Sequence, residues 1–401
     1  MSPRGPIVWM AGTNWDAVAG TDKRLVQELA ATRPVMWVDP PVPVRVPRRG
    51  SLRSRLEQLD DSLLRLRVMA PPGVTRPLIR RITALWQHGA IRSAVTRAGW
   101  EPAAVVSAMP LARFPRGVGG AKILYVTDDW LEGSRLMGIS RSAVRSVLAS
   151  NLAQADGVAA VSGELLGRLA GLNPAGVGGL AAPAGQPACA VIPNGCPEPA
   201  GSMPPVPREP AACLVGTLNE RLDLDVLEAV QASGVKLVVI GPRSDRSPSF
   251  GLRLDALLKA ENVRWMGQLA AEELPGQLST FGAGITPYTD SPFNRASFPL
   301  KTLEYLAAGL AVVSTDMPSA RWLNTNLISV QTVPQEFALA VKAALAQRND
   351  RDGELLRKEF ASGHTWAARA LEFQALLDRA ANPGAHAALQ VPAALGTEAV
   401  R

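Results

Sequence analysis

Short apolar runs alternate along this chain with longer segments of helical periodicity. The runs are apolar on both faces, as buried parallel strands require, and the segments between them are long enough for crossover helices. The runs lie at 7–11, 35–39, 104–108, 123–128, 158–162 and 190–194, and then at 212–217, 236–241, 263–267, 283–288 and 311–315. The pattern predicts an α/β fold with a parallel sheet in each half of the chain.

Two stretches rich in proline and glycine divide this pattern. Residues 197–210 predict an interdomain linker, because proline lacks an amide donor and keeps the chain extended. Residues 173–188 predict a loop insertion within the first half. The expected units are a Rossmann-like domain at 1–200, a second at 201–362, an amphipathic C-terminal helix at 363–381 and a frayed tail at 382–401. Ligands of such sheets bind beyond the carboxyl ends of the strands, which places the site in the cleft between the domains.

The composition is that of a globular protein. Of 401 residues, 47% are hydrophobic and 19% charged, which disfavours disorder and coiled coil. Three cysteines and three histidines make neither a disulfide framework nor a zinc ligand set, and they fit a reducing, cytoplasmic setting. No apolar run reaches 18 residues, so we expect no membrane-spanning helix, and the opening run is too short for a signal peptide.

The positive charge is concentrated in one segment. Residues 41–100 contain 12 arginines against three acidic residues, a net +9, whereas the whole chain carries +7. One interpretation is an arginine-rich composition with solvated helix faces. Another is a basic face toward anionic lipid headgroups or an anionic acceptor, which would hold the protein peripherally on the inner face of the membrane. Nucleic-acid binding is disfavoured, because no aromatic residues or known motif accompany the charge.

The segment 287–315 predicts a strand, a polar loop, a helix and another strand. Pro299 stands where the helix begins, and Gly309 provides the cap that ends it. The start of this helix then points into the cleft, where its free amides and dipole favour an anion. A cation at Lys301 suits a bound anion nearby, and a carboxylate at Glu304 could accept two ribose hydroxyls. The alternative is a solvent-facing pair between these two side chains.

Paired acidic residues end the strand at 123–128. Asp128 could orient an acceptor hydroxyl or stabilise positive charge on a sugar, which makes it the candidate catalytic residue. Adjacent side chains of an extended chain point to opposite faces, so Asp128 and Asp129 do not form an acid/base dyad if both stay extended. We expect Asp129 to cap the next helix instead.

The loop after the first strand lacks nucleotide-binding fingerprints. There is no GxGxxG sequence there and no GxxxxGK[ST] sequence anywhere, which argues against dinucleotide binding and against an ATPase. Trp15 in this loop could stack on a sugar ring or simply pack. Ser162 is expected to cap a helix. The three histidines, His88, His364 and His386, show no partner in the sequence, and none is assigned a catalytic role.

The segment 297–315, SFPLKTLEYLAAGLAVVST, resembles the C-terminal signature of family 4 (group 1) glycosyltransferases of the GT-B fold, in particular the bacterial branch that builds teichuronic acids and exopolysaccharides. Further similar segments follow in order at 190–195, 213–229, 263–269 and 363–377. The resemblance implies two Rossmann-like domains with parallel sheets facing a central cleft, and a C-terminal helix that crosses back to the first domain.

The resemblance also implies roles for individual residues. A nucleoside-diphosphate sugar would be bound mainly by the second domain, with Glu304 at the ribose, a loop before it at the diphosphate and sugar, and Arg221 at a phosphate. The implied donor-binding residues are Gly216, Arg221, Gly267, Ser297, Phe298, Leu300, Lys301 and Glu304. The implied acceptor-binding residues are Gly12, Asn14, Trp15 and Asp16. For Arg221 the alternative is an ion pair with Asp223 or Asp225.

One departure from the family pattern affects the expected function. The signature has two glutamates eight positions apart, and Ala296 stands where the first belongs. The chain is then a subgroup with other contacts, a transferase with an altered sugar preference, or an inactive relative. Asn294, Arg295 and Ser297 are the polar residues nearby.

The expected function is transfer of a sugar to a polysaccharide or lipid-linked acceptor. The resemblance implies retention at the anomeric carbon, no metal and no cofactor. No DxD motif lies in a suitable loop; residues 223–225 have the spacing but fall in a predicted helix. The alternatives are an inactive nucleotide-sugar-binding or scaffold protein, and a nucleotide-sugar epimerase. A nicotinamide dehydrogenase lacks its glycine fingerprint.

Overall fold

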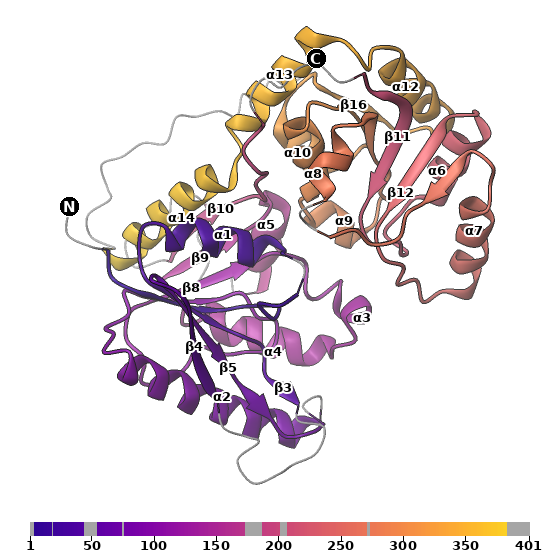
Figure 1. Ribbon diagram of the computed structural model, residues 1–401. Coiled ribbons are helices and arrows are strands. Elements are labelled where there is room, and N and C mark those ends of the chain that lie inside the picture. Colours follow the sequence, from indigo (N-terminus) through magenta and orange to yellow (C-terminus); the bar gives the residue numbers. More distant parts are fainter. Residues whose placement is uncertain are drawn as a thin grey trace, which may run out of the picture.

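The chain folds around two sheets, one in each half (Figure 1). The computed structural model describes residues 4–17, 19–43, 54–73, 76–172, 187–200, 207–270 and 273–382. Nearly all of the predicted insertion and of the predicted tail lies outside the described residues. The predicted α/β fold with two parallel sheets is confirmed, with one antiparallel exception at an edge.

The first sheet has eight strands, and six of its seven strand pairs are parallel; the β4–β5 pair at one edge is antiparallel. Its spatial order is β10 (Ala188–Val191), β9 (Gly157–Ala160), β8 (Ala121–Val126), β7 (Ala104–Ser107), β1 (Ile7–Met10), β2 (Val35–Val38), β5 (Leu63–Arg67) and β4 (Arg55–Asp60). The runs of β1, β2, β7 and β9 are buried along their whole length, as the two-sided apolar pattern predicted.

The second sheet has six strands, all parallel. Its spatial order is β13 (Val263–Trp265), β12 (Lys236–Ile240), β11 (Glu209–Val215), β14 (Phe281–Thr286), β15 (Ala311–Thr315) and β16 (Ile328–Gln331). The strand order reverses beside the first strand of each sheet, between β11 and β14 here and between β1 and β7 in the first sheet. Ligands of open parallel sheets bind at such reversal points, beyond the carboxyl ends of the strands.

Three features of the sheets differ from the sequence prediction. No strand was predicted in the basic segment 41–100, but besides α2 it forms an antiparallel hairpin of β4 and β5 and two short paired strands, β3 (Val42–Pro43) and β6 (Met69–Ala70). The strand β16 was not predicted, because its run is short and partly exposed. The predicted linker ends before residue 209, because Glu209 and Pro210 belong to β11.

Helices connect the strands. Those of the first half are α1 (Thr21–Ala30), α2 (Pro77–Arg97), α3 (Ser134–Met137), α4 (Arg141–Leu152) and α5 (Gly163–Leu172). Those of the second half are α6 (Leu224–Ala232), α7 (Pro248–Leu258), α8 (Leu274–Leu278), α9 (Pro292–Ala296), α10 (Leu300–Ala307), α11 (Pro318–Leu323), α12 (Pro334–Ala346), α13 (Arg351–Ser362) and α14 (Trp366–Ala381). Within the described ranges, no helix combines the length and the apolar character that a bilayer crossing requires.

The last helix, α14, returns to the first half of the chain and lies along α1 and the strands β8 to β10 (Figure 1). Thr365 caps its start by accepting a hydrogen bond from the amide of Ala368. Phe373 is fully buried, with its ring centroid 5.1 Å from that of Trp9 and 5.5 Å from that of Tyr125. The C-terminal helix therefore completes the core of the first sheet.

Candidate functional site

Glycines follow the strand at each reversal point. Gly12 comes after β1, and a Cβ atom there would lie 3.0 Å from the carbonyl oxygen of Ala108, which follows β7. Gly216 comes after β11 with φ of +152°, and Gly267 comes after β13 with φ of +71°, conformations that favour glycine. The backbone is therefore closely packed at the first reversal point, whereas Gly216, at the second, is open to an approaching ligand, and Gly267 lies beyond the edge strand β13.

Glu304 on α10 is buried and paired with two cations. The Nζ atom of Lys301 lies 2.6 Å from Oε2, and an Nη atom of Arg24, on α1 of the first domain, lies 3.6 Å from Oε1. The alternative of a solvent-facing pair is wrong, because the carboxylate is 5% exposed. The residue predicted to bind ribose therefore lies where the two domains meet. Sequence reasoning missed Arg24, which is more than 250 positions away along the chain.

The loop before α10 is largely occupied by contacts within the protein. The amide of Ser297 donates to the carbonyl of Asn294 at 3.1 Å, and its hydroxyl donates to the carbonyl of Phe293 at 2.9 Å. The carbonyl of Phe298 accepts from Nδ2 of Asn194 at 2.5 Å. The amide and the hydroxyl of Ser297 are thus both used within the protein in this arrangement, and the predicted contacts of this loop with a nucleotide sugar stay a prediction.

Arg221 is held in place by one hydrogen bond and two aromatic rings. Its Nε donates to Oδ1 of Asn294 at 2.9 Å. The guanidinium carbon lies 4.9 Å from the ring centroid of Phe293 and 5.3 Å from that of Tyr288. Asn294 also donates through Nδ2 to the carbonyl of Arg221 at 3.0 Å. Sequence reasoning treated Asn294 as a polar substitute for the missing glutamate, but its amide instead positions Arg221.

The alternative ion pairs of Arg221 are not formed. Asp223 caps α6 by accepting from the amides of Asp225 and Val226. Asp225 instead pairs with Arg253. The two acids of the 223–225 spacing are therefore occupied at the start of a helix, as the sequence indicated.

Asp128 follows β8 and is the catalytic candidate. No described residue donates a hydrogen bond to its carboxyl group. Burial raises the pKa of Asp128 to about 6; the positive charge of Arg221 opposes this shift, and the negative charge of Asp129 adds to it. The side chain of Asp128 in the first domain thus lies within electrostatic reach of Arg221 in the second.

Both carboxylate oxygens of Asp129 are used in contacts within the first domain. Its Oδ1 accepts from the amides of Leu131 and Glu132 at 3.1 and 3.0 Å, and its Oδ2 lies 2.5 Å from an Nη atom of Arg168. It therefore caps the turn before α3 rather than the helix itself. No two-carboxylate dyad forms from this pair.

Asp22, in the first turn of α1, carries a second buried carboxyl. The N-cap of α1 is Gly20, and Asp22 turns back instead to accept from the amide of Gly12 at 2.8 Å. Its other oxygen, Oδ1, is buried and has no hydrogen-bond partner among the described residues. Burial raises the pKa of Asp22 to about 7; the Gly12 amide lowers it, and the charge of Asp128 raises it further. Two interacting carboxyls therefore lie at the end of the first sheet.

The remaining acceptor candidates lie on the loop after β1. Asn14 is exposed. The ring of Trp15 packs edge-on against Trp37 at 5.2 Å, so the packing alternative for Trp15 is realised. Asp16 forms two hydrogen bonds with Arg65 at 2.9 and 2.8 Å, which hold the pKa of Asp16 below its usual range. Asn14 and Asp16 are both exposed, and Asp16 is the one of the two that is paired with Arg65.

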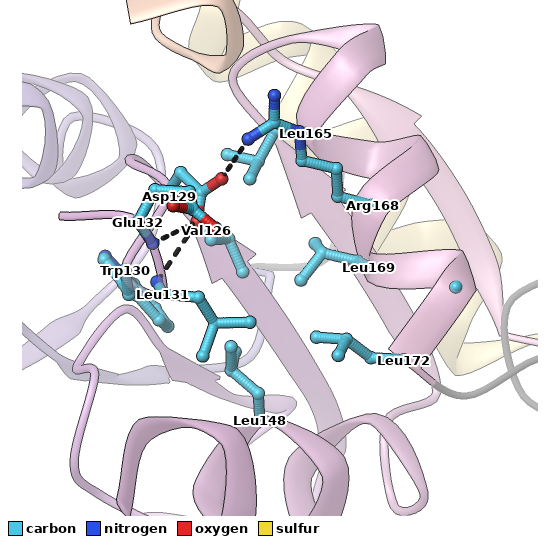
Figure 2. Close-up of a pocket in the computed structure, with 11 residues that line it drawn as sticks. Val126, Asp129, Trp130, Leu131, Glu132, Leu148, Leu165, Arg168, Leu169 and Leu172 are labelled. Atoms are coloured by element: carbon cyan, nitrogen blue, oxygen red, sulfur yellow. Dashed lines mark hydrogen bonds and ion pairs between the residues drawn. The ribbon is translucent and has the colours of Figure 1, made fainter. Parts of the chain in front are cut away.

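Two cavities adjoin these residues. One of about 240 Å³ lies between the domains and is lined by Glu132, Leu136, Glu220, Arg221, Ser291, Pro292 and Phe293. The other, of about 290 Å³, lies within the first domain behind Asp129. Figure 2 shows the second cavity with leucine side chains from α4 and α5 on its walls and the pair of Asp129 and Arg168 at one end.

Ala296, where the family signature has a glutamate, is fully buried. Its carbonyl accepts from the hydroxyl of Ser162 at 2.6 Å, and that hydroxyl caps α5 as predicted, by accepting from the amide of Leu165. Arg295 pairs with Asp290. None of the three polar neighbours of Ala296 is therefore free to replace the missing carboxylate in this arrangement.

Two described histidines do have partners, which corrects the sequence prediction. Nε2 of His88 lies 3.3 Å from the carbonyl oxygen of Arg113. Nδ1 of His364 lies 2.6 Å from an Nη atom of Arg369, and burial lowers the pKa of His364 to about 4. Neither adjoins Asp128 or Arg221. In the described part of the chain, no group of His, Cys, Asp and Glu side chains is arranged to hold a metal ion.

Comparison with known protein families finds a match in the second domain. Residues 210–347 match the protein family described as Glycosyl transferases group 1. The second domain is a group 1 glycosyltransferase domain. The match contains β11 to β16 and includes Arg221 and Glu304. The predicted kinship with group 1 glycosyltransferases is confirmed.

One curated relative and several solved structures extend the comparison. A protein of Bacillus subtilis (strain 168), provisionally assigned to teichuronic acid biosynthesis as the glycosyltransferase TuaH, is 29% identical over 157 residues. That match covers 38% of this chain and only 39% of the relative. The bacterial branch named from the sequence is thereby supported.

The structural likeness covers nearly the whole chain. The apo structure of OtsA has a TM-score of 0.68 at 14% identity, covering 92% of this chain and 98% of that one. A sucrose-phosphate synthase from Thermosynechococcus elongatus has a TM-score of 0.67 at 15% identity, covering 94% and 99%. At such identities the likeness shows the fold, and it confirms the predicted GT-B architecture. The domain match and these neighbours together support the predicted enzyme class, a glycosyltransferase.

Proposed function

We propose that this protein transfers a sugar from a nucleoside-diphosphate sugar to a polysaccharide or lipid-linked acceptor. The observation that carries the proposal is the cavity between the domains, which is lined by Arg221 of the second domain. Asp128 of the first domain, whose carboxyl accepts no hydrogen bond from any described residue, interacts electrostatically with this arginine. A nucleotide sugar bound between the domains would place its diphosphate at Arg221 and its sugar near Asp128.

Arg221 suits the leaving diphosphate. Its guanidinium is oriented before any ligand arrives, by Asn294 and by the rings of Tyr288 and Phe293. A fixed cation stabilises negative charge that grows on the leaving group without reorganisation at the moment of reaction. Asp128, ionised above its pKa of about 6, would stabilise positive charge that develops on the sugar or orient the acceptor hydroxyl.

Glu304 would bind the ribose of the donor. Its pairing with Lys301 and Arg24 keeps two cations at the start of α10, a helix terminus that favours a phosphate. Retention at the anomeric carbon and independence of a metal or cofactor are part of the proposal, on the basis of the resemblance. One structural neighbour, a trehalose-6-phosphate protein from E. coli, was solved with UDP-2-fluoro glucose, so UDP is the first nucleotide to test.

The decisive experiment measures donor binding and transfer on matched variants. UDP, GDP, ADP, dTDP and NAD are each added to the purified protein, and the melting temperature is followed. One diphosphate should stabilise the wild type, by about 2.7 kcal/mol at a hundredfold excess over its dissociation constant. Arg221→Ala and Glu304→Gln should lose this shift. Arg253→Ala, which removes an arginine on the outer helix α7, should keep it.

Asp128→Asn separates binding from chemistry. This variant should bind the same diphosphate as the wild type and lose transfer on the order of a hundredfold, the scale of removing one electrostatic group from an active site. Wild-type transfer should fall as the pH drops below about 6, because Asp128 then becomes protonated. Undiminished transfer by Asp128→Asn would remove the residue from the mechanism.

The second candidate function is that of an inactive relative that binds a nucleotide sugar. The buried Ala296 and its occupied polar neighbours favour it. Donor binding without turnover on lipid-linked or polysaccharide acceptors would support this candidate over the transferase. If no nucleoside diphosphate shifts the melting temperature, both candidates fail.

A further inference from the structure

The first half of α2 shows apolar side chains to solvent. Leu78 and Leu85 are each 70% exposed, Ile82 is 46% exposed and Trp86 is 42% exposed. Their spacing places them on one face of the helix, so they form a continuous strip, here named the α2 stripe. Single exposed apolar residues are ordinary on protein surfaces, whereas a contiguous strip on a helix indicates a surface that binds something.

The opposite face of the same turns is polar although it is buried. Thr83 and Gln87 both face the protein. The Thr83 hydroxyl has no hydrogen-bond partner in the described part of the chain, and Nε2 of Gln87 contacts the sulfur of Met109 at 3.8 Å. Farther along, Ile91 and Ala94 are fully buried on this face. The helix therefore cannot turn its leucines inward without exposing Ile91 and Ala94.

The charges around the stripe select an anionic partner. Helix α2 contains four arginines and no acidic residue. Arg81 and Arg92 on the helix, and Arg76 just before it, are exposed. The surrounding segment 41–100 carries a net +9. An apolar strip that includes a tryptophan, flanked by arginines, is the composition of a helix that lies in the interface of a membrane with anionic headgroups.

The position of α2 suits this partner. The helix runs along the outer side of the first domain, away from the second domain (Figure 1). A membrane there would leave Arg221 and Asp128 free. We propose that α2 lies in the surface of an anionic bilayer, with the α2 stripe inserted among the acyl chains and the flanking arginines at the headgroups. This inference concerns a surface apart from the proposed donor site and stands independently of it.

The experiment measures co-sedimentation of the full chain with vesicles. One set contains phosphatidylcholine alone, and the other contains equal parts of phosphatidylcholine and phosphatidylglycerol. The test variant is Leu78→Ser with Leu85→Ser. The matched control is Leu252→Ser with Leu339→Ser, because these leucines are exposed to 71% and 65% on helices of the second domain. All four positions are exposed, so the substitutions leave the core intact.

The wild type and the control should bind the anionic vesicles. The test variant should bind them at least ten-fold more weakly, on the order of the loss expected for two buried leucines. Arg76→Glu with Arg81→Glu should also weaken binding, and added salt should reduce the difference between this variant and the wild type because salt screens charge. The stripe variant should still bind the vesicles more weakly than the wild type at high salt.

Three results would overturn the proposal. The first is wild-type binding to neither set of vesicles. The second is an equal loss in the test variant and the control. The third is a wild-type dimer in solution that the stripe variant converts to a monomer without any vesicle binding, since the stripe would then bind a second copy of the chain. The melting temperature of the stripe variant should still rise when the nucleoside diphosphate is added. That result would show that its donor site is intact, so a loss of vesicle binding would concern the α2 stripe alone.

Discussion

The substitution Asp22→Asn tests the buried carboxyl beside the loop after β1. In the native protein, Oδ2 of Asp22 accepts from the Gly12 amide, and burial raises the pKa of the carboxyl from 3.8 to about 7. A raised pKa means that the folded state favours the protonated form. Its contribution to stability is therefore complete below pH 4, declines as the pH rises toward 7, and is lost above 7.

The size of the effect follows from the shift. About three pKa units correspond to roughly 4 kcal/mol between the ends of this range. Asparagine keeps an oxygen for the Gly12 amide and has no charge to bury. Its amide nitrogen would take the place of Oδ1, which has no hydrogen-bond partner among the described residues. Burying this N–H group without an acceptor costs about 1–3 kcal/mol. We expect Asp22→Asn to be less stable than the wild type at pH 5, and to match or exceed it at pH 8.

The assay is urea unfolding of both proteins at pH 5, 6.5 and 8. The difference in unfolding free energy should change by roughly 2–4 kcal/mol in favour of the variant across this range. Asp16→Asn is the control, because the pKa of Asp16 is lowered and this carboxylate stays ionised throughout. If the difference between Asp22→Asn and the wild type is the same at every pH, Asp22 does not titrate there and the reasoning is refuted.

Three further substitutions test packing around the donor domain and the domain contact, all by urea unfolding. Tyr305→Phe should destabilise the protein by about 1–3 kcal/mol, because the amide of Val215 donates to the buried Tyr305 hydroxyl at 2.8 Å and would lose its acceptor. Unchanged stability would show that this hydrogen bond does not contribute. Gly284→Ala should destabilise by at least about 1–3 kcal/mol, because the new Cβ would lie 2.3 Å from the Tyr305 ring; unchanged stability would show that the ring can move. Asn194→Ala should cost about 1–3 kcal/mol by leaving the Phe298 carbonyl unpaired, and equal stability would mean that water replaces the amide.

The family resemblance and the ends of α10 could both be predicted from the sequence, because both depend on residues that are neighbours along the chain. The signature around Glu304 is a local run, so its residues stay together whatever the rest of the chain does. The boundaries of α10 were equally local. Pro299 precedes its first residue, and Gly309, with φ of +76°, follows its end.

The roles of individual site residues were less accessible. Asn294 was noticed as a polar residue near the missing glutamate, but its bond to Arg221 joins positions 73 residues apart. Trp15 was left between stacking and packing, and the neighbouring ring of Trp37 decided for packing. Arg24 and the raised pKa of Asp22 gave no signal in the sequence, because each depends on which groups the folded chain brings alongside.

The sequence by itself determined most of the strands and the two ends of α10, because two-sided apolar runs, glycines and prolines act on their immediate neighbours. Only the tertiary structure decided that Glu304 meets Arg24 across the domains, that segment 55–67 forms a hairpin, and that α2 turns its leucines outward. Periodicity shows that a helix has an apolar face, but the side of that helix that meets the core is fixed by residues such as Ile91 and by the sheet they pack against.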